Sequence, residues 1–457
     1  MKKNLKFFVG MFVAKMIQIL LKLFRRNASH LPGWIALKIC PDLLGRIGKP
    51  ETIIAVTGTN GKTTVSNILI DILESNGYDV LNNKLGSNID GGIASSLISG
   101  STLFGKAKKK VAVLEVDERS SKKIYPYIKP KYILCTNIFR DSMKRNAHTD
   151  FIVDIINSAI PEESKLILNA DDLICSGLGT DKNKKIYFGI DKLDTDLNEC
   201  INIINDIRTC PKCGAKLKYD YVRYHHIGKA HCEKCNYKSP ESNYLGTNID
   251  FENNTIDIKT SEGIQKYNLI SNNIINIYNM VAAIAVLKEF GICEDDIKKA
   301  FSTYKVVESR YFEEEINGKK IIKYLAKGQN PVACSRTFDY IKHEKGKKAV
   351  MLNLDDYFDA KESSENMAWI YDADYELLNS DDIVQIIVGG ARCKDHYVRL
   401  LLAGIPKEKI FIDKSEIEAT KYLRPEEVDK IFILYDVYTV EISDRVKEAI
   451  ENKIKGE

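Results

Sequence analysis

The stretch TIIAVTGTNGKTT, residues 52–64, decides the fold of this chain. Its first half is an apolar, largely β-branched run, its second half is a glycine-rich turn, and Val65 to Leu73 then continue with helical spacing. A phosphate cradle requires this order of strand, glycine-rich loop and helix start, because backbone N–H groups and the positive end of the helix dipole face the anion. The stretch therefore predicts a nucleotide-binding α/β domain.

Each residue type in this stretch has a chemical role. Lys62 would reach the β- and γ-phosphates, and the Thr63 hydroxyl would bind Mg²⁺. Val56 stands where the general GxxxxGK[ST] pattern has its first glycine, so a strand–helix turn with an incidental Gly-Lys is the alternative. The candidate nucleotide-binding residues are Gly58, Thr59, Asn60, Gly61, Lys62, Thr63 and Thr64.

Polar residues follow further predicted buried strands. The apolar run from Val111 to Glu118 ends in three acids, and we take Glu115 as the candidate Mg²⁺ ligand and catalytic carboxylate, because α/β sheets present ligands at the carboxyl ends of strands. Runs 132–135 and 166–168 are also followed by polar residues. We expect one shared crevice there, although any single residue could be only a helix cap.

Four cysteines stand in two CxxC pairs, separated by residues 214–231. Two such knuckles aim four thiolates at one tetrahedral Zn²⁺, and this closed sphere is typical of a structural site. A redox dithiol or unliganded cysteines are the alternatives. The insert also holds His225, His226 and His231, which we expect at the surface. The candidate zinc ligands are Cys210, Cys213, Cys232 and Cys235.

Composition excludes several classes of protein. The chain has 457 residues, of which 44% are hydrophobic and 28% are charged, so it can bury real cores and is neither disordered nor fibrous. Lys and Arg number 67 against 63 Asp and Glu, which leaves a net charge of +4. We therefore expect no nucleic-acid partner, despite basic and tyrosine residues in the cysteine insert. The odd number of cysteines, 11, does not indicate a secreted disulfide framework, so the expected location is cytoplasmic.

The first segment is basic and apolar. Its first acid is Asp42, and Lys15 and Gln18 interrupt the apolar run from Phe7 to Phe24. No stretch is long and clean enough for a spanning helix, and no small-residue cleavage site indicates a signal peptide. Two interpretations stay open: a helix at the inner face of the membrane, or a helix packed on the next domain.

Several segments of the sequence resemble a known family of enzymes. Residues 57–63 resemble the phosphate loop of the Mur ligases, including its missing first glycine. Those enzymes make acyl phosphates from carboxylates and join them to amines. Segments over nearly the whole chain resemble the MurT family, the synthetase subunits of lipid II isoglutaminyl synthase. They are LPGWIALK (31–38), NKLGSN (83–88), TNIFRD (136–141), IYNMVAA (277–283), GARCKD (390–395) and the four-cysteine insert, which ordinary Mur ligases lack.

The resemblance implies an α/β fold, with a Mur ligase-type P-loop ATPase domain that carries a four-cysteine zinc-ribbon insertion and a second, Rossmann-like domain after it. We expect a basic amphipathic segment over 1–45, the ATP-binding domain over 46–305 with the ribbon at about 205–240, and the C-terminal domain over 306–457. The expected strands of the last domain are 349–352, 383–388 and 431–435.

The resemblance also implies a reaction. ATP would phosphorylate the α-carboxylate of D-glutamate in the lipid II stem peptide, and ammonia would displace the phosphate to leave D-isoglutamine. Asn279 resembles the family residue near the nucleotide, and Arg310 the arginine at the junction with the last domain. About 50 residues precede Val56, whereas ordinary Mur ligases carry a UDP-binding domain of about a hundred residues there. This difference favours a lipid-linked substrate.

The ammonia needs a source. The sequence contains no Gly-x-Cys-x-Gly elbow for a glutaminase nucleophile, and the resemblance supplies a separate glutamine amidotransferase subunit, GatD. The resemblance implies that an acidic residue of the C-terminal domain completes the partner's Cys–His pair, in a segment that in the family reads like Asp-Val-Ser-Trp. Here residues 366–372 read NMAWIYD. Asn366, Asp372 and Glu365 are therefore the candidates, and structural roles for all three stay open.

Two other functions remain as alternatives. One is a Mur-like ligase that adds an amino acid, of the folylpolyglutamate or cyanophycin type. The other is a nucleotide-switched binding module that uses the zinc ribbon.

Overall fold

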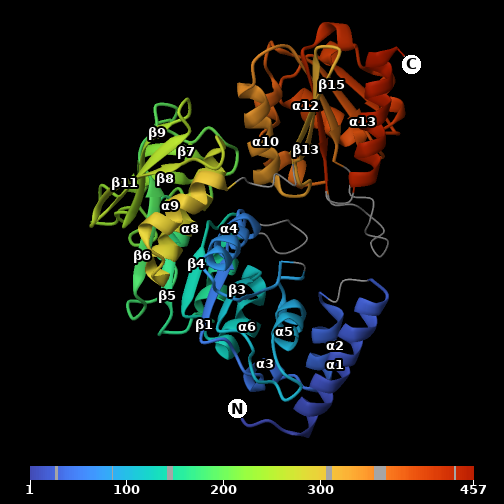
Figure 1. The fold of residues 1–457 in the computed structure, drawn as a ribbon. Helices are drawn as coiled ribbons and strands as arrows, with labels where there is room; N and C mark the ends of the chain where they lie inside the picture. Colours follow the sequence, from blue (N-terminus) through green and yellow to red (C-terminus); the bar gives the residue numbers. More distant parts are fainter. Residues whose placement is uncertain are drawn as a thin grey trace. The chain divides into compact units, whose positions relative to one another are not determined.

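Two mainly parallel sheets organise the chain in this computed structural model (Figure 1). The structure describes residues 1–25, 29–84, 86–140, 148–304, 311–354, 367–436 and 439–456. They form two compact units. The first unit comprises Met1–Phe139, His148–Cys200 and Asn205–Val306, and the second comprises Arg140–Ala147, Ile201–Ile204 and Val307–Glu457.

The first unit is built on a sheet with strand order β11-β10-β9-β6-β5-β4-β1-β3-β2. The pairs from β2 to β9 are parallel, and β9, β10 and β11 are antiparallel. The strand β1 lies between β4 and β3 and is buried along nearly its whole length, as expected for a parallel strand covered on both faces. The strands are β1 (Thr52–Thr57), β2 (Val80–Asn82), β3 (Val111–Glu115), β4 (Tyr132–Cys135), β5 (Lys165–Asn169), β6 (Lys185–Ile190), β9 (Tyr244–Asp250), β10 (Thr255–Thr260) and β11 (Gly263–Asn268).

Helices cover this sheet. One of them, α8, is buried almost all round, which explains why its sequence is apolar without a polar face. The helices of the sheet are α4 (Lys62–Ser75), α5 (Asp90–Ser99), α6 (Ser121–Ile128), α7 (Thr149–Asn157), α8 (Ile274–Phe290) and α9 (Glu294–Thr303).

The N-terminal helices belong to the same core. Phe7 and Met11 of α1 (Leu5–Leu23), Ala36 of α2 (Leu31–Ile39) and Leu43 of α3 (Leu43–Arg46) share one hydrophobic cluster with the first sheet. The helices α1 and α2 lie side by side (Figure 1). No helix in the described part of the chain combines the length and the apolar content that crossing a membrane requires.

The cysteine insert contains an antiparallel hairpin, β7 (Lys218–Tyr224) and β8 (Ile227–His231). Its small core joins Cys210, Leu217 and Cys232 to Leu173, which lies just after β5. The insert therefore packs on the main body of the first unit.

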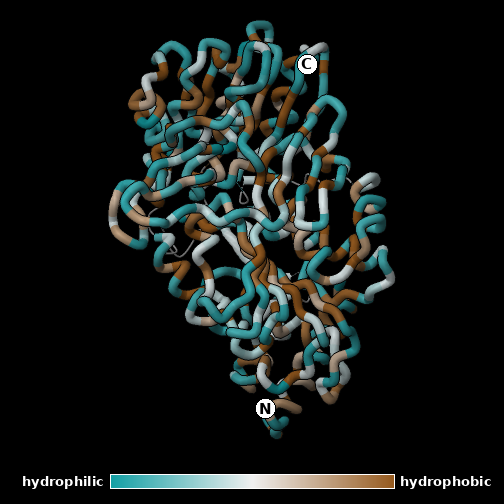
Figure 2. Tube along the Cα trace, turned by 90° about the vertical axis from the view of Figure 1, so that its left-hand side faces the viewer, coloured by the Kyte–Doolittle hydropathy of each residue, from teal (hydrophilic) through white to brown (hydrophobic). Residues whose placement is uncertain are grey.

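The second unit has strand order β12-β13-β17-β14-β15-β16, with an antiparallel pair only between β12 and β13 among its named strands. Alternate residues of the strands belong to two separate hydrophobic clusters. Both faces of the sheet are therefore covered, as in a Rossmann-like fold. In Figure 2 brown, hydrophobic segments pass through the interior of the trace, and teal, hydrophilic segments dominate its outer loops. The elements are β12 (Tyr311–Ile316), β13 (Lys319–Leu325), α10 (Pro331–His343), β14 (Lys348–Asn353), α11 (Trp369–Asp372), β15 (Ile383–Gly389), α12 (Cys393–Leu402), β16 (Ile410–Asp413), β17 (Lys430–Tyr435) and α13 (Val440–Lys455).

Candidate functional site

The loop between β1 and α4 has the backbone of a phosphate cradle. Gly58 and Gly61 have φ angles of 119° and 90°, a region that favours glycine. A Cβ on Gly58 would lie 2.3 Å from the Thr136 hydroxyl oxygen, and a Cβ on Gly61 would lie 2.2 Å from the Asn279 amide oxygen. Only glycine fits at either position. Lys62, Thr63 and Thr64 follow at once in the first turn of α4.

Polar residues after β4 hold this loop in place. The Asn60 N–H donates to Asn137 Oδ1 at 3.0 Å, and Asn137 Nδ2 donates back to the Asn60 carbonyl at 3.0 Å. Thr136 Oγ1 donates to the same carbonyl at 2.6 Å. Thr59 Oγ1 lies within hydrogen-bond distance of both the N–H and the carbonyl of Phe139. The predicted crevice residues Thr136 and Asn137 thus shape the cradle from its neighbouring strand.

Glu115 lies beside the loop at the end of β3. Its Oε2 accepts a hydrogen bond from Thr63 Oγ1 at 2.9 Å, and its Oε1 accepts one from Asn88 Nδ2 at 3.2 Å. Asn83 bonds to both the N–H and the carbonyl of Glu115, which fixes the strand end. A hydroxyl and a carboxylate oxygen in contact are the hard oxygen ligands that suit Mg²⁺.

Sequence reasoning missed the residue that Lys62 contacts. Lys62 Nζ lies 2.9 Å from Glu118 Oε1, and the two side chains are only 13% and 11% exposed. Burial alone would lower the pKa of Lys62, but the carboxylate of Glu118 outweighs burial and raises the pKa above its usual range. Burial raises the pKa of Glu118, against the opposing effect of Lys62. The contact with Glu118 therefore favours the charged form of Lys62.

The strand β3 is shorter than the predicted run from Val111 to Glu118. β3 ends at Glu115, because Asp117 Oδ1 accepts hydrogen bonds from the N–H groups of Arg119 and Ser120 and turns the chain into a short 3-10 helix. This turn directs Glu118 to Lys62. The signal available in the sequence was the cluster of three acids at one strand end.

Asn279 lies on α8 and is 2% exposed. Its Nδ2 donates to Asn276 Oδ1 at 3.4 Å, and its Oδ1 faces Gly61. The fold thus brings Asn279 to the cradle, and its role at the nucleotide stays a prediction. Arg310 lies outside the described residues.

A buried ion cluster connects the cysteine insert to the first sheet. Arg223 of β7 is 4% exposed and pairs with Asp196 at 2.7 Å and with Asp171 at 3.6 Å. Lys229 of β8 reaches Asp171 at 3.1 Å, and the Tyr278 hydroxyl of α8 donates to Asp171 at 2.7 Å. Burial of an isolated carboxylate is costly, so this set of partners fixes the insert in one position.

Two histidines of the insert are not at the surface, and this expectation is wrong. His225 and His226 are fully buried, because Phe139 packs against both rings at centroid distances of 5.7 and 4.6 Å. His226 Nε2 also lies 3.3 Å from Asp172 Oδ1. Only His231 of the three stays partly exposed, with 38% of its side chain accessible.

The four cysteines of the insert come together. Their sulfur atoms lie within 4.8 Å of one another, with 3.6 Å between Cys210 and Cys235 and 3.5 Å between Cys213 and Cys232. A tetrahedral zinc site with bonds of about 2.3 Å has sulfur atoms about 3.8 Å apart. The cluster therefore has the size of a four-cysteine zinc site.

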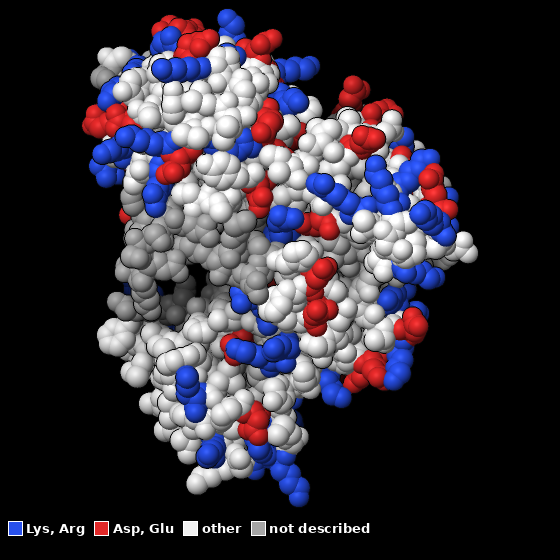
Figure 3. Space-filling view, turned by 180° about the vertical axis from the view of Figure 1, so that it is seen from behind, with Lys and Arg blue, Asp and Glu red and all other residues white. Residues whose placement is uncertain are grey.

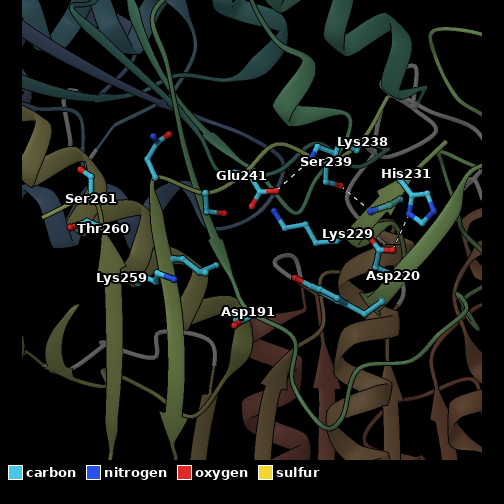
Figure 4. Close-up of a pocket in the computed structure, with 15 residues that line it drawn as sticks. Asp191, Asp220, Lys229, His231, Lys238, Ser239, Glu241, Lys259, Thr260 and Ser261 are labelled. Atoms are coloured by element: carbon cyan, nitrogen blue, oxygen red, sulfur yellow. Dashed lines mark hydrogen bonds and ion pairs between the residues drawn. The ribbon is translucent and has the colours of Figure 1, made fainter. Parts of the chain in front are cut away.

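A cavity of about 630 Å³ lies between the insert hairpin and β9–β10 (Figure 4). Four of its charged side chains pair with one another. His231 Nδ1 lies 2.9 Å from Asp220 Oδ1, and Lys238 Nζ lies 3.7 Å from Glu241 Oε1. No phosphate-loop residue lines it, so it is not part of the nucleotide site.

The candidate residues for completing a partner's active site lie in the second unit. Asp372 ends α11 with its side chain 23% exposed, and its carboxylate lies 3.5 Å from Arg140, which is grouped with the same unit. Asn366 and Glu365 lie outside the described residues.

Comparisons with known proteins place the chain in a family. Residues 56–287 match the family model described as Mur ligase middle domain, and residues 327–440 match the one described as MurT ligase C-terminal. The chain is 33% identical over 400 residues to "Lipid II isoglutaminyl synthase (glutamine-hydrolyzing) subunit MurT" of Staphylococcus aureus (strain COL), covering 86% of this chain and 87% of that protein. It is 32% identical over 435 residues to the protein of the same name from Streptococcus pneumoniae (strain ATCC BAA-255 / R6), covering 94% of each.

Solved structures share the fold. A pseudomurein peptide ligase type C from Methanothermus fervidus has a TM-score of 0.65 at 24% identity, covering 90% of this chain and 81% of that one. MurF ligase from Thermotoga maritima in complex with ADP has a TM-score of 0.56 at 16% identity, covering 93% and 84%. Fold and site together define an ATP-dependent ligase. The chain belongs to the Mur ligase family and, within that family, to the MurT subunits.

Proposed function

We propose that this chain is the synthetase subunit of a lipid II isoglutaminyl synthase. In this role it converts the α-carboxylate of D-glutamate in the lipid II stem peptide to the amide, through an acyl phosphate. The observation that carries the proposal is the cradle with Lys62, Thr63 and Glu115 in contact distance of its loop, in a chain similar to proteins named as that synthase subunit.

The proposed chemistry is the activation of an unreactive carboxylate. ATP supplies the phosphoryl group, and Mg²⁺ supplies charge neutralisation, with Thr63 and Glu115 as its ligands. The loop N–H groups and the start of α4 bind the phosphate oxygens. Before the nucleotide binds, Glu118 stabilises the charged form of the buried Lys62. When the nucleotide binds, Lys62 would move from Glu118 to the phosphates. Asn279 and Arg310 complete the nucleotide site.

We assign zinc to the four cysteines as a structural ion. Four thiolates leave no open position for substrate, and a closed site of this kind contributes folding energy. The ion would hold the insert against the first sheet, beside the buried partners of Asp171.

The ammonia comes from a GatD-like glutamine amidotransferase partner. The relatives are named as subunits of a glutamine-hydrolysing synthase, and this sequence has no Gly-x-Cys-x-Gly nucleophile elbow of its own. Asp372 or Asn366 orients the partner's catalytic histidine, since an acid or an amide can hold an imidazole in the required tautomer.

The proposed amidation takes place in the cytoplasm, at the inner face of the membrane. A lipid-linked substrate presents its stem peptide at that surface, and the chain meets it there.

A Mur-like ligase that adds an amino acid is the competing enzyme. Two observations argue against this competing ligase: residues 327–440 match the MurT C-terminal model, and the insert holds the four-cysteine cluster. A nucleotide-switched binding module would need no ligated carboxylate at all.

The test is ATP turnover by the purified chain with lipid II and ammonium salt, followed by mass spectrometry of the product. The expected product has an amino group in place of one hydroxyl, and ADP forms in proportion to it. Incorporation of an amino acid instead of ammonia would support the competing ligase. ATP turnover that does not depend on lipid II would contradict the proposal.

A further inference from the structure

The outer face of α1 is an exposed apolar stripe. Six large side chains that recur at helical spacing are between 40% and 75% exposed, a pattern that a surface helix of a monomeric domain rarely shows. They are Phe8, Phe12, Met16, Ile19, Leu20 and Leu23. We call these residues the α1 stripe.

The opposite face of α1 is firmly attached to the first unit. Phe7, Met11 and Ala14 are fully buried, and Gln18 Nε2 donates to the Ser95 carbonyl at 3.0 Å. A Cβ on Gly10 would lie 3.3 Å from the Ala36 carbonyl oxygen, which reflects how closely α1 and α2 approach. The helix is therefore ordered before anything meets the α1 stripe, and binding there costs little further ordering.

More apolar surface lies next to the stripe. Lys3 Nζ donates to the Phe104 carbonyl at 2.7 Å, so the loop with Leu103 and Phe104, which are 56% and 73% exposed, lies at the N-terminal end of α1. Trp34 of α2 is 46% exposed, and tryptophan is enriched where one side of a protein meets lipid headgroups.

The charged side chains of α1 itself are all basic. Lys6 and Lys22 are exposed at the two ends of α1, and the sequence has no acid before Asp42. Lys15 Nζ donates to the Ser101 carbonyl at 2.9 Å, and Ser101 forms an antiparallel bridge with Ala107, so the basic run 106–110 lies near the helix. In Figure 3 the lower end of the molecule is mainly white, with more blue than red.

We propose that the α1 stripe, with its lysines and the Leu103–Phe104 loop, docks the first unit on an anionic phospholipid bilayer. Lysines that flank an apolar helix face match negative headgroups, and the apolar side chains enter the boundary with the acyl chains. Docking would serve the proposed function, on which this purpose rests, because it brings the phosphate loop to a substrate that is anchored in the same bilayer.

The experiment is co-sedimentation of the full chain with vesicles. The wild-type chain should sediment with an equal mixture of phosphatidylglycerol and phosphatidylcholine, bind phosphatidylcholine alone much more weakly, and detach at high salt. The double variant Phe12→Ser, Leu20→Ser should lose binding roughly tenfold or more. The matched control is Phe251→Ser, since Phe251 is also exposed, at 44%, but lies between β9 and β10.

Charge is tested in the same assay. Lys6→Glu, Lys22→Glu should weaken binding to the anionic vesicles, and Lys192→Glu, at an exposed lysine far along the sequence, should not. A wild-type chain that stays in the supernatant with anionic vesicles would overturn the proposal, as would a stripe variant that binds like wild type. A dimer that the stripe variant dissociates, without vesicle binding, would assign the stripe to a second copy instead.

The assay is independent of the chemistry. Vesicle binding with no amidation would leave the docking surface intact and reject the proposed function. Amidation of a water-soluble lipid II analogue should be the same in wild type and in the stripe variant, because the stripe lies on the exposed face of α1 and the phosphate loop lies between β1 and α4.

Discussion

The carboxyl edges of the two sheets differ in their chemistry, although both sheets are built from buried parallel strands. At the first edge, β1 runs into two left-handed glycines and a helix that begins with Lys62. At the second edge, Asn353 ends β14 and Asp436 follows β17, both are buried, and neither strand is followed by a Gly-Lys-Thr helix start. A parallel sheet thus offers a place for a site, and at the first of these edges the loop has the backbone of a phosphate cradle.

The largest effect is expected from removing Lys62, the lysine that distinguishes the first edge from the second. Lys62→Ala should lower amidation roughly thousandfold with either nitrogen donor, because both routes pass through the same acyl phosphate. Steady-state ADP release measures it, and circular dichroism checks the fold. Lys182→Ala is the control, since Lys182 is 67% exposed and pairs only at the surface. Wild-type turnover in folded Lys62→Ala protein would reject the site.

A substitution in the second unit should separate the two donors. With the partner subunit present, Asp372→Asn or Asn366→Ala should lower the glutamine-driven rate roughly tenfold or more, and the ammonium-driven rate should stay as in wild type. Parallel amidation assays with the two donors measure this difference. If both rates fall together for both variants, the second unit does not complete the partner's site.

A smaller effect is expected from weakening one ligand. Glu115→Gln keeps the hydrogen bond to Thr63 but removes the charge, so the Mg²⁺ concentration for half-maximal turnover should rise roughly tenfold. Activity should recover in part at high Mg²⁺. A Mg²⁺ titration of ADP release shows this, and an unchanged midpoint would remove Glu115 from the metal site.

The cysteine insert should affect stability more than chemistry. Cys213→Ser should lose one zinc ion per chain and open the insert to proteolysis between residues 205 and 240, with a lesser effect on turnover. Elemental analysis and limited digestion measure the two changes. Wild-type protein that carries no zinc after purification without chelator would contradict the assignment.

The smallest effect concerns pH and the second unit alone. Burial lowers the pKa of His396 from its usual 6.5 to about 4. The unfolded chain then binds a proton between these values that the folded chain does not, so stability falls as the pH drops below about 6.5. We expect a loss of about 2 kcal/mol between about pH 7 and pH 5. Urea unfolding of wild type and His396→Gln at both pH values checks this, and equal pH slopes would contradict it.

The parts of this molecule that are local in sequence were the ones that could be predicted. The strand, loop and helix of residues 52–73 follow from pattern alone, and two CxxC knuckles bring their thiolates together through short turns. The pair of Lys62 and Glu118 depends instead on how β3 lies beside β1 and on the turn at Asp117. The sequence between Lys62 and Glu118 gives no sign that the two side chains come into contact.

Burial of His225 and His226 could not be predicted for a similar reason. Polar rings in an insert are usually exposed, and here Phe139, far away in the sequence, covers both. The contact arises only when the hairpin packs on the loop after β4. Long-range packing of this kind overrides the local preference of a residue.

The most direct test of the central claim is trapping of the acyl phosphate. The purified chain is given ATP, Mg²⁺ and lipid II with hydroxylamine as the only added nitrogen nucleophile. If Lys62, Thr63 and Glu115 activate a carboxylate at the edge of the first sheet, a lipid II hydroxamate should form with an equal amount of ADP, and Lys62→Ala should form neither. A hydroxamate in the Lys62→Ala variant, or ADP release by wild type without hydroxamate, would contradict the account.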